Sequence, residues 1–85
     1  MSKIKVLYRQ KLKMSVGKIA AQTAHAVLLL SEQTDIHWLM PVIVLGVNEA
    51  PFNAKKEQAG VVVINDAGYT EVEAGTATVL AFVEN

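Results

Sequence analysis

The sequence predicts an α/β fold in which helices cover the faces of a small, mostly parallel, four-stranded sheet with one antiparallel strand. Segments with strand periodicity alternate with segments of helical periodicity, in the order strand, helix, strand, helix, strand, loop, strand. The chain has 85 residues, so we expect one domain over residues 1–85. Apolar side chains make up 52% of it, enough for a packed core and too many for a disordered chain.

The first strand is expected over residues 3–9, where alternate side chains from Ile4 onward form one apolar face. A polar connection follows, and Ser15 is suited to cap a helix over residues 16–31. At about 100° per residue, one face of this helix collects apolar and small side chains that we expect to face the core. They are Val16, Ile19, Ala20, Thr23, Ala24, Val27 and Leu28.

The continuous apolar run at residues 42–47 is short and mostly β-branched. It predicts a second strand, buried on both faces. Residues 48–59 contain Pro51 followed by a polar stretch, a pattern that allows a short helix ended by Gly60.

A third apolar strand is expected over residues 61–65, followed by a glycine-containing loop over residues 66–76. The last strand is expected over residues 77–83. Because the loop before it is too short to hold a crossover helix, we expect this strand to add antiparallel.

Composition and spacing exclude several classes of protein. Without cysteine there is no disulfide scaffold and no cysteine-ligated metal site. His25 and His37 lack the spacing of metal ligands, so we expect neither a metal nor a cofactor. No apolar run approaches the ~18 residues of a membrane-spanning helix, and the charged start of the chain lacks the apolar region of a signal peptide. We therefore expect a cytoplasmic protein without membrane contact.

The formal net charge is zero, but the charges are unevenly distributed. Residues 1–31 carry six of the eight basic side chains and no acid, whereas residues 32–85 carry all eight acids and two cations. One account is that the two halves pair their charges across the fold. The other is a basic arm, made of Arg9, Lys11 and Lys13, that together with the helix start faces phosphate.

Lys18, Gln22 and His25 are spaced so that they share one sector of the first helix, opposite the expected apolar stripe. A solvated polar face would explain this pattern. However, Lys18 lies in the first turn, where the helix dipole disfavours a cation by about 0.3–1 kcal/mol. A cation there makes sense if the free N–H groups of the helix start bind an anion together with it. Gly17 would let such a ligand approach the backbone closely.

Asp66 directly follows the third strand, and ligands in open α/β sheets bind beyond the carboxyl ends of strands. If the strands ending at Arg9 and Asn65 run parallel, Lys18 and Asp66 meet at one edge of the sheet. The pair could be a plain salt bridge, or it could orient a water or a substrate hydroxyl. The loop and the strand after it add the hydroxyls of Thr70, Thr76 and Thr78.

Two segments resemble the signatures of the archaeal and eukaryotic type of peptidyl-tRNA hydrolase. The first is KMSVGKIAAQTAHA at residues 13–26, and the second is DAGYT at residues 66–70 followed by GTATVL at residues 75–80. The resemblance implies a four-stranded mixed sheet between helices, often in dimers. It also implies metal-independent hydrolysis of the ester that joins a peptide to the 3′ end of tRNA, so that tRNA is the expected partner.

By this resemblance the catalytic residues are Lys18, Asp66 and Thr70. Asp66 would orient or deprotonate a water, and Lys18 would stabilise charge on the ester or on a phosphate. The residues expected to contact the substrate, including those of the basic arm, are Gly17, Gln22, His25, Thr78, Arg9, Lys11 and Lys13.

The chain departs from this family at several places. Tyr69 stands where the family has arginine, Ala74 where it has proline, and Ala77 where it has lysine. The chain is also shorter than usual, and fewer covering helices leave more apolar sheet surface, which favours a homo-oligomer, most simply a dimer. The alternative function is therefore a catalytically inactive, oligomeric relative that binds a protein or an RNA.

Overall fold

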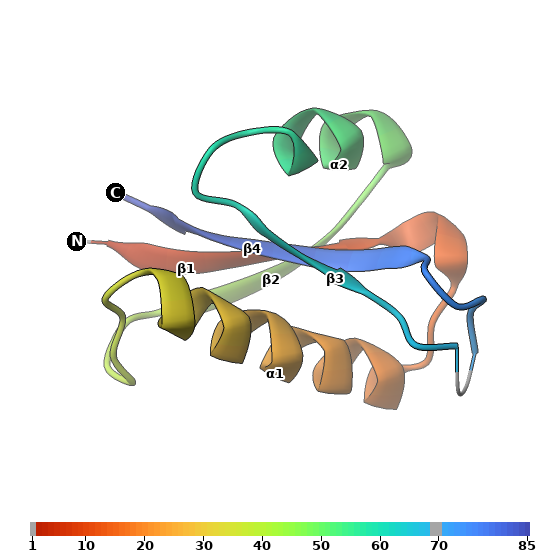
Figure 1. Ribbon diagram of the computed structural model, residues 1–85, viewed down its shortest axis with the longest axis horizontal. Coiled ribbons are helices and arrows are strands. Elements are labelled where there is room, and N and C mark those ends of the chain that lie inside the picture. Colours follow the sequence, from red (N-terminus) through yellow and green to blue (C-terminus); the bar gives the residue numbers. More distant parts are fainter. Residues whose placement is uncertain (1, 69–70) are drawn as a thin grey trace.

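The chain folds into a four-stranded sheet with one helix on each face (Figure 1). The computed structural model describes residues 2–68 and 71–85. In chain order the elements are β1 (Lys3–Arg9), the short 3-10 helix η1 (Gln10–Leu12), α1 (Val16–Gln33), β2 (Val42–Val47), α2 (Glu49–Lys56), β3 (Val62–Asn65) and β4 (Ala77–Glu84). The predicted order of strands and helices is confirmed.

The strands lie in the order β2-β1-β4-β3. β1 pairs with β2 in parallel, whereas β4 pairs antiparallel with both β1 and β3. The expected antiparallel last strand is confirmed, but the expectation of a mostly parallel sheet is wrong. The reason is the place that β4 takes: it returns from a short loop and enters between β3 and β1. β1, β2 and β3 still point the same way, but within the described residues only β1 and β2 are parallel neighbours.

The prediction that residues 42–47 form a strand buried on both faces is wrong in its second part. β2 is an edge strand, and Val42, Val44 and Leu45 remain 49%, 41% and 41% exposed. It lies at the edge of the sheet, and both helices pack mainly over its other strands. A Cβ at Gly46 would come 2.7 Å from the Tyr8 ring and from the Gln10 side chain, so glycine leaves room there for both side chains.

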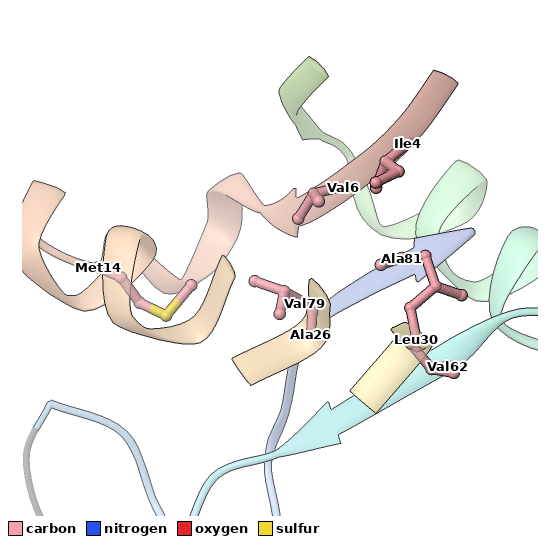
Figure 2. Packing of buried hydrophobic residues seen from close by; sticks show 8 residues of the cluster. All are labelled: Ile4, Val6, Met14, Ala26, Leu30, Val62, Val79 and Ala81. Atoms are coloured by element: carbon pink, nitrogen blue, oxygen red, sulfur yellow. The ribbon is translucent and has the colours of Figure 1, made fainter. Parts of the chain in front are cut away.

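The core lies on both sides of the sheet. Under α2, Phe52 packs with side chains of β1 and β4. Figure 2 shows the larger cluster under α1, in which Ala26 and Leu30 lie against the sheet. The buried residues of this cluster are Ile4, Val6, Met14, Ala26, Leu30, Val62, Val79 and Ala81.

The face that α1 buries differs from the predicted stripe. Val16 and Leu28 are 85% and 65% exposed, whereas Gln22, Ala26 and Leu30 are buried. These three residues form one row at spacing i, i+4, i+8, and the small Ala26 at its centre lets the helix approach the sheet. The predicted N-cap is confirmed, because the Ser15 Oγ accepts a hydrogen bond from the Lys18 backbone N–H at 3.2 Å.

Neither helix of the described part of the chain combines the length and the apolar character needed to cross a membrane.

Candidate active site

The carboxyl ends of β1 and β3 and the start of α1 lie at the same end of the molecule (Figure 1). β4 separates β1 from β3, yet both run in the same direction, so residues that follow them reach the same edge. Lys18 comes from the first turn of α1, and Asp66 directly follows β3. This is the edge at which the sequence predicted that the two side chains meet.

Asp66 is the centre of the site. The Lys18 Nζ donates to its Oδ1 at 2.5 Å, and the Gln22 Nε2 donates to the same oxygen at 2.6 Å. The Gly68 backbone N–H donates to Oδ2 at 2.6 Å. The side chain of Asp66 is only 4% exposed and that of Lys18 only 12%. The carboxylate is thus held by three donors in a nearly closed position.

These contacts stabilise the ionised form of Asp66. The hydrogen bond from Lys18 lowers the pKa of the Asp66 carboxyl most, followed by the backbone N–H of Gly68. Burial acts in the opposite direction, because it disfavours a charge, but it does not reverse the shift. Asp66 is therefore an anion throughout the physiological range.

The loop after Asp66 folds back on itself to form this geometry. The Asp66 N–H donates to the Thr76 carbonyl at 2.8 Å, and the Gly75 N–H donates to the Asp66 carbonyl at 2.7 Å. Gly68 has a φ of 85°, and a Cβ there would lie 2.7 Å from the backbone of Ala74. Only glycine satisfies both conditions, so Gly68 is needed to present its N–H to Asp66.

Glu71 is a member of the site that the sequence reasoning missed. Its carboxylate accepts from the Ser15 N–H at 2.7 Å and from the Ser15 Oγ at 2.5 Å, which ties the loop to the start of α1. The Ser15 contacts lower the pKa of the Glu71 carboxyl, and the charge of Lys18 adds to this. A signal was present: the first turn of α1 has no acid of its own, and a helix start favours a nearby carboxylate.

An open cleft of about 540 Å³ adjoins the Lys18–Asp66 pair. Its polar end is formed by these two residues and Gln22, and His25 lines it farther along α1. Ala21, Leu29 and Ile64 also line the cleft and give it an apolar wall. The predicted sector of Lys18, Gln22 and His25 therefore lines one cleft, although Gln22 is buried rather than solvated.

Arg9 lies elsewhere. Its guanidinium donates to Glu49, from Nε to Oε2 at 2.9 Å and from Nη2 to Oε1 at 2.5 Å, and Nη1 donates to the Ala77 carbonyl at 2.9 Å. It also lies 5.8 Å from the centre of the Phe52 ring, on the α2 side of the sheet. The hydrogen bonds with Glu49 raise the pKa of Arg9 and lower that of Glu49. The structure does not bring Arg9 to the cleft.

The other predicted contact residues take different positions. Lys11 and Lys13 are exposed on the segment that leads into α1, and Gly17 is exposed in the first turn of that helix. Thr78 is fully buried, and its hydroxyl donates to the Ile64 carbonyl at 3.4 Å, so it supports the sheet beside the cleft. The prediction for Thr70 falls outside the described residues, as does the departure at Tyr69.

The ion pairs bear on the two accounts of the charge distribution. Lys3 and Lys5 pair with Glu84, at 3.6 and 3.5 Å. Arg9 pairs with Glu49 and Lys18 with Asp66. Four of the six cations of the first half thus meet acids of the second half, which supports charge pairing across the fold. Within residues 2–68 and 71–85, Lys11 and Lys13 form no ion pair.

Metal-binding side chains are not grouped: in the described part of the chain, no three His, Asp or Glu residues lie together as a potential ligand set.

A comparison with protein families supplies the remaining finding. The family model described as "Peptidyl-tRNA hydrolase PTH2" matches residues 2–83, which is nearly the whole chain and includes all the elements of the fold except the last residue of β4.

Proposed function

The chain belongs to the peptidyl-tRNA hydrolase PTH2 family, and we propose that it hydrolyses the ester between a peptidyl or N-substituted aminoacyl group and tRNA. The products are the free peptide and free tRNA. The observation that carries the proposal is the pair formed by Lys18 and Asp66 at the polar end of an open cleft. A cation held at a fixed position beside such a cleft can stabilise the negative charge that develops on an ester during hydrolysis, and a fixed anion can orient the attacking water.

Lys18 is assigned the electrostatic role. When water attacks the acyl carbon, negative charge develops on the carbonyl oxygen, and the Lys18 ammonium at the cleft stabilises it. The bond between the acyl carbon and the ribose oxygen then breaks, and the ribose oxygen takes up the proton that the attacking water gives up, so that it leaves as a hydroxyl. Asp66 fixes the ammonium for this purpose through the 2.5 Å contact.

Asp66 is assigned the orientation of the attacking water rather than its deprotonation. The lowered pKa of its carboxyl makes it a weak base, and a strong general base has a pKa near the working pH. Its Oδ1 already accepts from Lys18 and Gln22, whereas Oδ2 accepts only from Gly68 among the described residues. A carboxylate oxygen accepts two hydrogen bonds, so Oδ2 can hold a water.

The alternative function is a catalytically inactive relative that binds RNA or protein. The observation that favours it is the small number of cations near the cleft. Ala77, where the sequence departs from the family's lysine, is a half-buried strand residue, and Arg9 is held by Glu49 on the other side of the sheet. This alternative predicts binding without ester cleavage.

The test is release of the acyl group from N-acetyl-aminoacyl-tRNA. We expect cleavage by the wild type and a loss of about 10²–10³-fold in kcat for Lys18→Ala, the range for removing one group that stabilises an oxyanion. Asp66→Asn should also lose activity, because a neutral amide no longer fixes the ammonium. Lys3→Ala is the matched control. It also breaks an ion pair between a lysine and a carboxylate, here that of Glu84, but Lys3 lies at the end of β1 that is far from the site. This variant should therefore cleave like the wild type.

Binding of tRNA without release by the wild type would favour the alternative function. Equal rates for the wild type and Lys18→Ala would refute the role assigned to Lys18.

A further inference from the structure

Glu71 contacts the start of α1 but has no part in the chemistry proposed above. The loop that follows β3 lies beside the first turn of α1 (Figure 1), and it brings two carboxylates there. Asp66 binds the Lys18 ammonium, and Glu71 binds Ser15, the N-cap of the same helix. Glu71 and Ser15 are exposed and 56 positions apart in the sequence, so neither burial nor proximity along the chain explains their contact.

Both oxygens of the Glu71 carboxylate are used. Oε1 accepts from the Ser15 backbone N–H at 2.7 Å, and Oε2 accepts from the Ser15 hydroxyl at 2.5 Å. The oxygen of that hydroxyl accepts in turn from the Lys18 backbone N–H at 3.2 Å. Ser15 therefore joins Glu71 to the residue whose ammonium binds Asp66. With the covalent chain from Asp66 to Glu71 these contacts form a closed circuit, so a shift of the loop against α1 disturbs the Lys18–Asp66 pair.

The Glu71 contact holds a part of the loop that the hydrogen bonds between its ends do not reach. The Asp66 N–H donates to the Thr76 carbonyl, and the Gly75 N–H donates to the Asp66 carbonyl. These two bonds close the loop on itself but do not fix it against α1. Lys18 attaches the loop at Asp66, but in the proposed reaction its ammonium also faces the oxyanion. Glu71 attaches the loop through a contact that the reaction leaves intact.

The charge of Glu71 suits the place that it occupies. A helix start carries partial positive charge, and the first turn of α1 has no acid of its own. The hydrogen bonds from the Ser15 side chain and backbone lower the pKa of the Glu71 carboxyl, and the charge of Lys18 adds to this. The carboxylate is therefore ionised at neutral pH, and both of its oxygens accept hydrogen bonds from the helix start.

We propose that Glu71 is a positioning residue that acts through Ser15. By holding Ser15 it fixes the loop against α1, and so sets where Asp66 lies relative to the Lys18 ammonium. Its effect on the rate rests on the proposed ester hydrolysis, whereas its effect on Asp66 does not. A misplacement of about 1 Å that originates far from the reacting atoms can slow an enzyme about 10²-fold, so an indirect contact of this kind is measurable.

The first experiment needs no substrate. The pKa of the Asp66 carboxyl is measured by NMR, from the shift of its carboxyl carbon, in Glu71→Ala and in Glu71→Gln. Both variants remove the charge of Glu71, so the difference between them reports the contact alone. A glutamine amide can still accept from the Ser15 N–H and donate to the Ser15 hydroxyl oxygen, whereas alanine can do neither.

We expect a higher pKa for Asp66 in Glu71→Ala than in Glu71→Gln. The hydrogen bonds from Lys18 and from the Gly68 N–H hold this pKa below its ordinary value of 3.8, and they loosen when the loop moves. Equal values in the two variants overturn the proposal, whether or not the protein cleaves an ester. A wild type that releases no acyl group, together with unequal pKa values, refutes the ester hydrolysis and supports the positioning of Asp66.

The second experiment measures cleavage of N-acetyl-aminoacyl-tRNA. We expect Glu71→Ala to lower kcat by about 10–100-fold and to keep KM within about twofold, because the contact orients groups that act on the bound ester. Glu71→Gln should recover most of this rate. Glu73→Ala removes another exposed carboxylate of the same loop, and as the matched control it should cleave like the wild type. A change in KM alone overturns the proposal, as do equal losses of kcat for Glu71→Ala and Glu71→Gln.

A double-mutant cycle tests the route through Ser15. Ser15→Ala removes the hydroxyl that joins Glu71 to the Lys18 N–H, and circular dichroism checks that α1 still forms without this cap. If Glu71 acts through that hydroxyl, the loss of kcat in the double variant is smaller than the product of the two single losses. Losses that multiply show that the two residues act independently, and they overturn the proposal.

Discussion

Among single residues, Asp66 combines two demands that usually conflict. It is nearly closed off from solvent, which disfavours a charge, and it is ionised because Lys18, Gln22 and Gly68 donate to it. The same contacts that prepare the candidate site therefore contribute to folding. A change at Asp66 affects stability as well as chemistry, so each variant needs both measurements.

The pH dependence of stability follows from the direction of the shift. The pKa of Asp66 is below its ordinary value of 3.8 in the folded protein, so at acid pH the unfolded chain binds a proton before the folded one. The stabilisation is complete above that ordinary value and is lost as the pH falls through the folded pKa. We expect the unfolding temperature of the wild type to fall more steeply with acid than that of Asp66→Asn, so that their difference narrows below about pH 4.

The measurement is thermal unfolding by circular dichroism at a series of pH values. Asp35→Asn, at an exposed position, controls for the loss of one carboxyl elsewhere. A constant difference between the wild type and Asp66→Asn from neutral to strongly acid pH would contradict the linkage.

The sequence allowed part of this site to be predicted. Lys18 and Asp66 could be brought together because the ends of codirectional strands share an edge, whichever strand lies between them. The burial of Gln22 could not be predicted, since helical periodicity places a polar residue in solvent unless its partner is known. Glu71 was missed because its contact with Ser15 depends on the path of a loop, which no periodicity encodes.

At the scale of elements, α1 shows that a rotation of roughly 100° about the helix axis changes which residues carry the packing. The predicted stripe was centred on the most apolar face, but the buried row runs through Gln22, Ala26 and Leu30. The hydrogen bond between Gln22 and Asp66 and the small size of Ala26 favour this orientation. β2 illustrates the same limit: its apolar run predicted a strand correctly, but position within a sheet is set by pairing partners far away in the chain.

The orientation of α1 can be tested with two leucines. Leu30→Ala should destabilise the protein by about 2–5 kcal/mol, the usual cost of truncating a buried leucine. Leu28→Ala is its matched control on the same helix and should change stability by less than about 0.5 kcal/mol. Urea unfolding of both variants measures this. A larger effect at Leu28 than at Leu30 would restore the predicted stripe.

At the scale of the whole molecule, many of the charges that are separated along the sequence pair with each other in the fold. Cations of the first half pair with acids of the second, and among the described residues of the first half this leaves Lys11 and Lys13 as exposed cations without an ion pair. Composition could not decide between this arrangement and a basic arm, because both give the same separation of charges along the sequence. If the protein binds tRNA, few phosphates can be neutralised.

Salt dependence measures that number. With two phosphate contacts, from Lys11 and Lys13, the logarithm of the tRNA affinity should fall against the logarithm of salt concentration with a slope of about −1.4 to −1.8. Lys11→Gln and Lys13→Gln should each make the slope shallower by about 0.7–0.9, whereas Lys3→Gln should leave it unchanged. A slope of about −5 or steeper would mean that paired cations open to meet phosphate.

The central place of β4 has a consequence for how the chain acquires its shape during synthesis. Residues 77–84 are translated after all other described elements, yet they lie between β1 and β3 and supply much of both clusters of buried side chains. Until this segment has left the ribosome, the strand that lies between β1 and β3 is missing, and the sheet cannot be completed. Folding therefore waits for the end of β4, and nascent chains that stop before it expose apolar surface that only that strand can cover.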